Sequence, residues 1–312
     1  MKKAAIFIVL ILSVLTASSE ETMSLSLRAN PAQTLDVRTR RNIGIVLGTE
    51  AGLYAASMTG LYFAWYANYP QTRFHFFNDN AEWLQMDKMG HSATAYNVGV
   101  LGYEALKAAG LDETRAIWLG GSLGFVFLST VEVFDGLSSQ WGFSWGDMAA
   151  NTLGAGLFIG QQFLWHEQKM SLKYSFHPTH YAQYRPDVLG SNFAENLIKD
   201  YNGITIWLSM NCKSLFLNNK TNFPSWLNIA FGYSADGMTG GFNNATSYHG
   251  TPIPEFQRTR QFFLSLDIDF TRIKTNNKFL QYTFKILNII KIPFPAVEYK
   301  SDGQWAWHWF YF

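Results

Sequence analysis

The sequence of 312 residues has little charge and almost no cysteine. Charged residues make up 15% of the chain, against about 25% in an average soluble domain. The formal net charge is +1, so there is no basic excess to meet nucleic-acid phosphates, and we expect no nucleic-acid partner. Cys212 is the only cysteine, which excludes a disulfide scaffold.

Apolar and aromatic residues are abundant instead. Hydrophobic residues make up 48% of the chain and aromatic residues 17%, a composition that rules out intrinsic disorder. The mean hydropathy of -0.05 is nevertheless low for a chain that lies mostly inside a membrane. The composition therefore indicates either a large globular core or a membrane protein with a substantial polar part.

The N-terminus has the pattern of a secretory signal peptide. Lys2 and Lys3 precede an apolar run from Ala4 to Leu15, which is too short to span a bilayer comfortably. Small residues follow, and we predict cleavage after Ser19, with an uncleaved membrane anchor as the alternative. No cysteine follows this run, so we expect no lipid attachment at the new N-terminus.

A polar leader over residues 20–41 separates the signal peptide from residues 42–168, which are apolar and rich in glycine and alanine. Small residues at near four-residue spacing allow helices to approach closely, and the pattern predicts a bundle of about four helices. The expected helices lie at residues 43–67, 87–109, 113–137 and 144–168, with a short one at 81–85. The first is long enough to cross a bilayer, and the last two are close to the minimum length.

Residues 169–312 are expected to form a β-rich part with short helices, packed on the bundle, so that the predicted fold class is α+β. Apolar and mostly polar residues alternate most clearly at 260–273, a period of two that predicts a half-buried strand. Further strands are expected at 204–210 and 226–233, and short helices at 186–199 and 279–290. These strands are too few for a closed membrane barrel, which needs about eight.

Polar residues of the types found in binding and catalytic sites occur near three of the predicted helix ends. If short turns make successive helices antiparallel, the start of the second helix, the end of the third and the start of the fourth meet at one end of the bundle. Spacings of three or four residues also place members from one helix on the same face. The residues expected to meet there are Asp87, Lys88, His91, Glu132, Asp135, Asp147 and Asn151.

Three roles are open for these residues. The first is a buried polar network in which every charge is paired. The second is a binding or catalytic site for a lipid-linked or anionic headgroup, where Lys88 and His91 hold the anion and an acid acts as base. The third is a metal site, which is weakened by the absence of a Glu-x-x-His spacing. The candidate metal ligands are His91, Glu132, Asp135 and Asp147.

Other motifs are weaker. His177 and His180 lie close together in a predicted loop, but such pairs are usually only solvated. The sequence has no Gly-x-Ser-x-Gly elbow, no dinucleotide-binding glycine pattern and no phosphate loop. We therefore predict no cofactor and leave open whether the protein is an enzyme.

Residues 87–162 resemble the VanZ-like and YfiM-like membrane-associated families. The similarity lies in Asp-Lys-Met-Gly-His at 87–91, Glu-Val-Phe-Asp at 132–135 and the stretch Ser-Trp-Gly-Asp-Met-Ala-Ala-Asn-Thr-Leu-Gly at 144–154. The whole chain is similar to a domain-of-unknown-function group of Bacteroidetes envelope proteins allied to the YfiM-like predicted lipoproteins. The resemblance implies an uncharacterised envelope protein and supplies no activity.

We therefore predict an exported, membrane-associated protein of a Gram-negative cell envelope, on the outer-membrane or periplasmic side. After cleavage, basic residues such as Arg38 and Arg40 would lie outside the cytoplasm, contrary to the positive-inside rule of inner-membrane proteins. The first interpretation of function is a structural role or envelope maintenance. The rivals are an enzyme or binder for a lipid-linked or anionic substrate and a metal-binding bundle. Membrane lipid and other envelope proteins are the expected partners.

Overall fold

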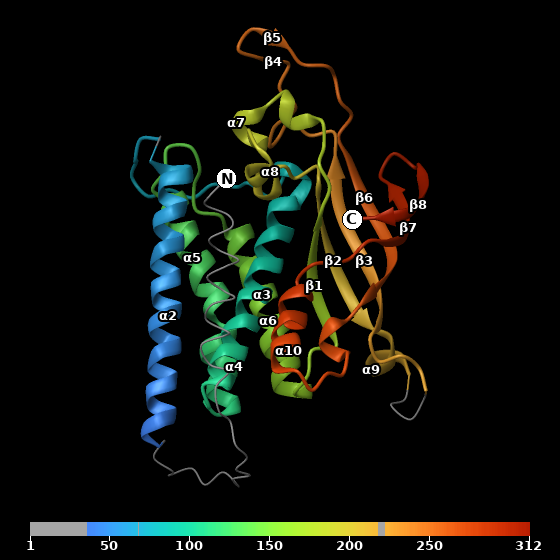
Figure 1. The fold of residues 1–312 in the computed structure, drawn as a ribbon. Coiled ribbons are helices and arrows are strands. Elements are labelled where there is room, and N and C mark those ends of the chain that lie inside the picture. The colour runs from blue at the N-terminus through green and yellow to red at the C-terminus, as the bar shows by residue number, and fades with distance from the viewer. Residues whose placement is uncertain (1–35, 68, 218–221) are drawn as a thin grey trace.

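The computed structural model describes residues 36–67, 69–217 and 222–312. The predicted signal peptide at 1–19 and most of the predicted leader lie outside the described residues. Figure 1 shows two layers, with helices side by side in one and a curled antiparallel sheet in the other. The predicted α+β class, with strands in the C-terminal part, is confirmed.

The helical part runs from the first described residues to the first strand. Its helices are α2 (Val37–Leu61), continued by a π-helical turn (Tyr62–Tyr66), then α3 (Met86–Ala108), α4 (Glu113–Gly121), α5 (Leu123–Gly136) and α6 (Trp145–Trp165). Helix α3 lies at the centre, since it packs on α4, α5, α6 and the first strands of the sheet. It therefore joins the two layers of Figure 1.

Side-chain caps explain where α2, α4 and α6 begin. The side chains of Asp36, Asp112 and Ser144 accept hydrogen bonds from backbone N–H groups that have no partner inside the first turn. The Asp36 cap makes α2 begin at Val37, so the prediction that residues 37–41 belong to an extended leader is wrong. The predicted start of the fourth helix at Ser144 agrees with its cap.

Two other predicted helices differ in detail. The helix predicted at 113–137 is interrupted at Ser122, which separates α4 from α5. The short helix predicted at 81–85 is a 3₁₀ turn, Glu82–Gln85, in which Trp83 and Leu84 have φ angles of 48° and 49°. These left-handed conformations kink the chain just before α3, and neither residue type signals them in sequence.

The C-terminal part contains a six-stranded sheet and several short helices. Its strands are β1 (Met170–Phe176), β2 (Ile204–Asn211), β3 (Leu227–Asp236), β6 (Thr259–Ile268), β7 (Phe294–Lys300) and β8 (Trp305–Tyr311), with a separate small hairpin of β4 (Ser247–Tyr248) and β5 (Thr251–Pro252). The helices are α7 (Pro186–Leu189), α8 (Phe193–Lys199), α9 (Cys212–Phe216) and α10 (Lys278–Leu287), with 3₁₀ turns at Tyr181–Gln183 and Phe270–Arg272.

All neighbouring strands of the large sheet are antiparallel, in the order β1-β2-β3-β6-β7-β8. Strands β1 and β7 were not among the predicted strands. The strand predicted at 260–273 ends at Ile268, and the helix predicted at 186–199 is divided by Gly190, whose φ of 100° ends α7.

One face of this sheet is apolar throughout, but helices cover only part of it. The pairing places Leu172, Leu208, Phe231, Leu264, Val297 and Trp307 in one row across the six strands. At β1 and β2 the row packs into the core shared with α3. Further along, Leu264 and Trp307 are 48% and 54% exposed, so the apolar face of β6–β8 is bare.

The opposite face of the sheet is largely polar and yet buried. Lys173 and Asp267 form an ion pair of 2.7 Å with both side chains fully buried. The sheet curls over this face, because Tyr311 of β8 stacks on Phe263 at 4.1 Å and its hydroxyl lies 3.2 Å from Thr205 of β2. The half-buried strand predicted at β6 is confirmed, but its apolar side faces outward.

Membrane-spanning potential is concentrated in one helical stretch of the described residues. Glu113–Gly136, which combines α4 and α5, is long and apolar enough to cross a membrane by length and composition alone. The expected spans at 43–67 and 144–168 do not meet the same criterion. For α2 the reason is visible in the sequence, because Glu50 and several glycine, serine and threonine residues lower the mean hydropathy of its apolar part.

Candidate functional site

A group of polar side chains meets where α3 and α6 begin and α5 ends. It forms there because the first turns of α3 and α6 and the last turn of α5 lie at the same end of the helical part. We call this group the acidic cluster. Its members are Asp79, Asp87, Lys88, His91, Glu132, Asp135, Asp147 and Asn151.

Lys88 lies among three carboxylates. Its Nζ is 2.7 Å from an oxygen of Asp79, 3.0 Å from Asp147 and 3.4 Å from Asp87. The Lys88 side chain is only 12% exposed, and charges buried to this degree are tolerated only when they are paired. All three ammonium donors are thus directed at acids of this protein, which leaves Lys88 poorly placed to hold an external anion.

His91 is oriented by Asn151. Its Nδ1 is 3.0 Å from Asn151 Oδ1, and an amide oxygen only accepts, so Nδ1 carries the hydrogen and donates it. The other ring nitrogen, Nε2, faces Asp87 Oδ1 at 3.9 Å and Glu132 Oε1 at 3.8 Å. Both distances are too long for hydrogen bonds. His91 Nε2 therefore faces two carboxylates without bonding to either.

Glu132 is the most deeply buried acid of the cluster, at 1% exposed. Its Oε2 accepts a hydrogen bond of 3.0 Å from the backbone N–H of Ser144, and its Oε1 has no hydrogen-bond partner. Asp135, one turn further along α5, accepts a hydrogen bond of 2.7 Å from the Tyr66 hydroxyl. Asp135 is thus held by α2's π-helical extension rather than by Lys88 or His91.

The protonation of the cluster follows from its burial and its mixed charges. Burial raises the pKa of Asp87, but the charges of His91 and Lys88 and a hydrogen bond from Tyr201 outweigh this and hold the pKa below its usual value. Burial, followed by the negative charge of Asp87, raises the pKa of Asp147 well above its usual value, although Lys88 lies beside it. The cluster therefore has more carboxylates than its cations can balance.

Every sequence-predicted site residue lies in or beside this cluster, whereas three further contributors were missed. Asp79 comes from the connection before α3, and Ser144 donates to it at 2.6 Å. Tyr66 and Tyr201 donate to Asp135 and Asp87, each at 2.7 Å. No helical spacing links these residues to the cluster, because they arrive from a turn, a loop and the C-terminal part.

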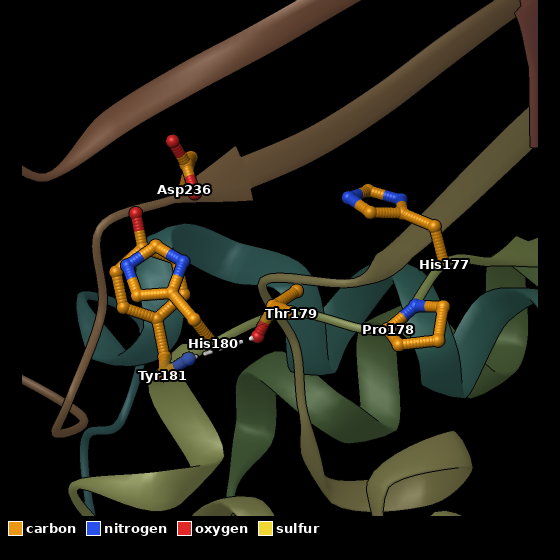
Figure 2. Close-up of a pocket in the computed structure, with 6 residues that line it drawn as sticks. All are labelled: His177, Pro178, Thr179, His180, Tyr181 and Asp236. Atoms are coloured by element: carbon orange, nitrogen blue, oxygen red, sulfur yellow. Dashed lines mark hydrogen bonds between the residues drawn. The ribbon is translucent and has the colours of Figure 1, made fainter.

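The histidine pair in the loop after β1 does not converge. Both histidines line an open pocket of about 530 Å³, and Figure 2 shows their rings well apart, with Asp236 on the side of His180 and Tyr181. His180 stacks on Tyr181 with ring centroids 4.1 Å apart, and burial lowers the pKa of His177. The described side chains that converge closely enough to share a metal ion are instead Asp87, His91 and Asp147, whose ligand atoms lie within 4.8 Å of one another.

Comparison with known proteins gives one match. Residues 75–160 match the model of a family described as a predicted periplasmic lipoprotein (DUF2279). No curated protein and no solved structure matches the chain. The matched stretch contains the whole acidic cluster and ends inside α6, whereas Tyr66 and Tyr201 lie outside it.

The match supports an uncharacterised envelope protein on the periplasmic side of a Gram-negative cell, and the matched family itself has no known function. It gives no support to the VanZ-like or YfiM-like resemblance or to a Bacteroidetes source. The family description includes a lipid anchor, whereas Cys212, the single cysteine of the sequence, is buried at the start of α9.

Proposed function

We propose that this protein is a membrane-associated envelope protein whose outer sheet face lies against lipid, with a structural or maintenance role in the envelope. The observation that supports this most directly is the reversed polarity of β6. Phe262, Leu264 and Leu266 are exposed, while Ser265 and Asp267 of the same strand are buried. A strand that faces water on its outer side has the opposite arrangement.

The large exposed apolar area of this face favours contact with lipid over contact with water. Exposed apolar patches larger than a few hundred Å² are rare on soluble monomers and indicate protein or membrane contact. Here the patch continues into β8, where Trp305 and Trp309 are each 71% exposed. Tryptophan is enriched at the boundary between lipid and water. The match to a periplasmic lipoprotein family agrees with a protein held at a membrane.

Vesicle flotation tests this proposal. We expect the purified protein to float with phosphatidylethanolamine–phosphatidylglycerol vesicles, and Leu264→Glu and Trp307→Glu to reduce the floating fraction severalfold, because a carboxylate in contact with acyl chains is unfavourable. Ile198→Glu is the matched control, since Ile198 is 55% exposed on α8, away from this face. Equal flotation of all four proteins, or none by the unaltered one, would contradict the proposal.

A further inference from the structure

We propose that the acidic cluster binds a divalent transition-metal ion, with His91 Nε2 and the carboxylates of Asp87 and Asp147 as ligands and Glu132 as a neighbouring negative charge. This inference goes beyond the proposed membrane association and does not depend on it. It starts from charge: the cluster has five carboxyl groups, and only one lysine and one histidine lie among them. A bound dication removes most of that imbalance without requiring several acids to stay protonated.

The second step is the geometry around His91. Ligand bonds to a zinc-like ion are about 2.0–2.2 Å long, so two ligands of the same ion lie roughly 3 to 4.2 Å apart, depending on the angle between them. His91 Nε2 lies 3.9 Å from Asp87 Oδ1 and 3.8 Å from Glu132 Oε1. The separation of His91 and Asp87 is too long for a direct hydrogen bond and falls in the range that a single ion would bridge. Asp147 completes a set of three ligand atoms that lie within 4.8 Å of one another.

The third step is the unpartnered oxygen of Glu132. A carboxylate oxygen buried without a hydrogen bond is unfavourable by roughly 1–3 kcal/mol or more. Glu132 Oε1 is such an atom, in a side chain that is 99% buried, and it faces His91 Nε2. Its other oxygen is held by the Ser144 N–H, so the side chain is oriented. A cation held by His91, Asp87 and Asp147 would stabilise the negative charge of this neighbouring carboxylate.

The surroundings of the ligands match those of metal sites. A metal-binding histidine usually donates its second ring N–H to an oxygen, which sets its orientation, and His91 Nδ1 donates in this way to Asn151 Oδ1. Asp87 is held by the Tyr201 hydroxyl at 2.7 Å. An imidazole ligand favours the Mn²⁺-to-Zn²⁺ series over Ca²⁺ and Mg²⁺, which prefer oxygen ligands.

Lys88 sets the limit on affinity. Its ammonium group contacts both Asp87 and Asp147, and it competes with the ion for these carboxylates. Lys88→Met removes this competitor and is expected to raise metal affinity severalfold. If the cluster is a purely structural network, Lys88→Met should instead lower stability, because it leaves buried acids without a partner. In that case the variant should bind no metal.

The experiment uses the full chain in detergent, stripped with a chelator, and titrated in turn with Zn²⁺, Mn²⁺ and Mg²⁺. Bound metal is measured by elemental analysis and affinity by calorimetry. We expect one equivalent of Zn²⁺ or Mn²⁺, its loss in His91→Ala, and an affinity about 10–100-fold lower in Asn151→Ala. His180→Ala is the matched control, because His180 lies outside the cluster, and it should bind as the unaltered chain does.

Two further measurements keep the test decisive if His91→Ala does not fold. Co²⁺ bound to the unaltered chain should show the absorption of an ion with one imidazole and two carboxylate ligands, and Asp147→Asn, nearly isosteric, should weaken binding at least tenfold. No bound metal in the unaltered chain, loss of metal in His180→Ala, or full affinity in Asp147→Asn would overturn the proposal. Flotation of metal-free protein reports on membrane association separately.

Discussion

Buried lysines occur in both layers, and their partners differ. Lys173 has one acid, Asp267, at 2.7 Å, and its Nζ also donates to the carbonyl of Ile268 at 2.7 Å. Lys88 in the acidic cluster shares three acids. The Lys173 pair therefore carries no excess of negative charge, since buried Lys291 also lies near Asp267, whereas the cluster does. We assign the first a structural role and reserve metal binding for the second.

The balanced pair leads to a prediction about stability. Asp267→Asn should lower the free energy of unfolding by about 3–5 kcal/mol, because it leaves Lys173 as an uncompensated buried charge. The double variant Lys173→Met with Asp267→Leu should recover most of this loss. Urea unfolding in mild detergent measures both. As a control, Asp187→Asn breaks the more exposed pair with Arg185 and should change stability by less than about 1 kcal/mol. Equal losses in the two single variants would count against this assignment.

At the scale of elements, glycine allows the helices to come close enough to bring the cluster together. A Cβ on Gly154 of α6 would lie 2.1 Å from the Ser92 carbonyl oxygen of α3. A Cβ on Gly124 of α5 would lie 2.2 Å from the carbonyl oxygen of Ala95, which also belongs to α3. These approaches place the ends of α5 and α6 beside His91. By contrast, nothing lies within 4 Å of such an atom at Gly44, where α2 is open.

Two glycines two residues apart in α6 test this role. Gly154→Ala should destabilise the protein by about 1–3 kcal/mol, since the added methyl group forces α6 away from α3. Gly156→Ala should instead stabilise it by up to about 1 kcal/mol, because Gly156 has open space around it and alanine favours a helix. Thermal unfolding of both variants in the same detergent decides the point. A gain in stability from Gly154→Ala would show that the helices are not held this closely.

At the scale of the molecule, the curled sheet separates a polar interior from an apolar exterior. Tyr311, the last residue of β8, closes the curl by packing on Trp207 and Phe263. Phe310, its neighbour in the chain, is 77% exposed on the opposite face. The final strand therefore has two separable functions, one in closing the sheet and one on the outer surface.

This separation predicts opposite behaviour for adjacent residues. Tyr311→Ala should lower the free energy of unfolding by about 3–5 kcal/mol, as expected for loss of a buried aromatic side chain. Phe310→Ala should change it by less than about 0.5 kcal/mol and should instead weaken vesicle flotation. Denaturant unfolding followed by tryptophan fluorescence, together with flotation, distinguishes the two. If Phe310→Ala were as destabilising as Tyr311→Ala, the closure would not depend on Tyr311.

The cluster was predictable where its residues lie on regular helices. Asp87 and His91, four residues apart, and Asp147 and Asn151, likewise four apart, share helix faces by geometry alone, and short turns bring these ends together. Asp79 and Tyr201 were not predictable, because a left-handed turn at Trp83 and a loop from the C-terminal part bring them in. Strand β1 was also missed, although apolar and polar residues alternate along Met170–Phe176.

The sequence by itself determined the α+β class, most helix positions, the alternation of β6 and the meeting of the polar helix ends, because periodicity and caps act locally. Only the tertiary structure decided which face of the sheet is buried. Alternation of apolar and polar residues is symmetric with respect to inside and outside, so it cannot tell which side will be covered. Here the curl closed by Tyr311 buries the polar side, and helices cover the apolar side only as far as β3. Few charges and many aromatic residues are the composition that such a reversed sheet requires.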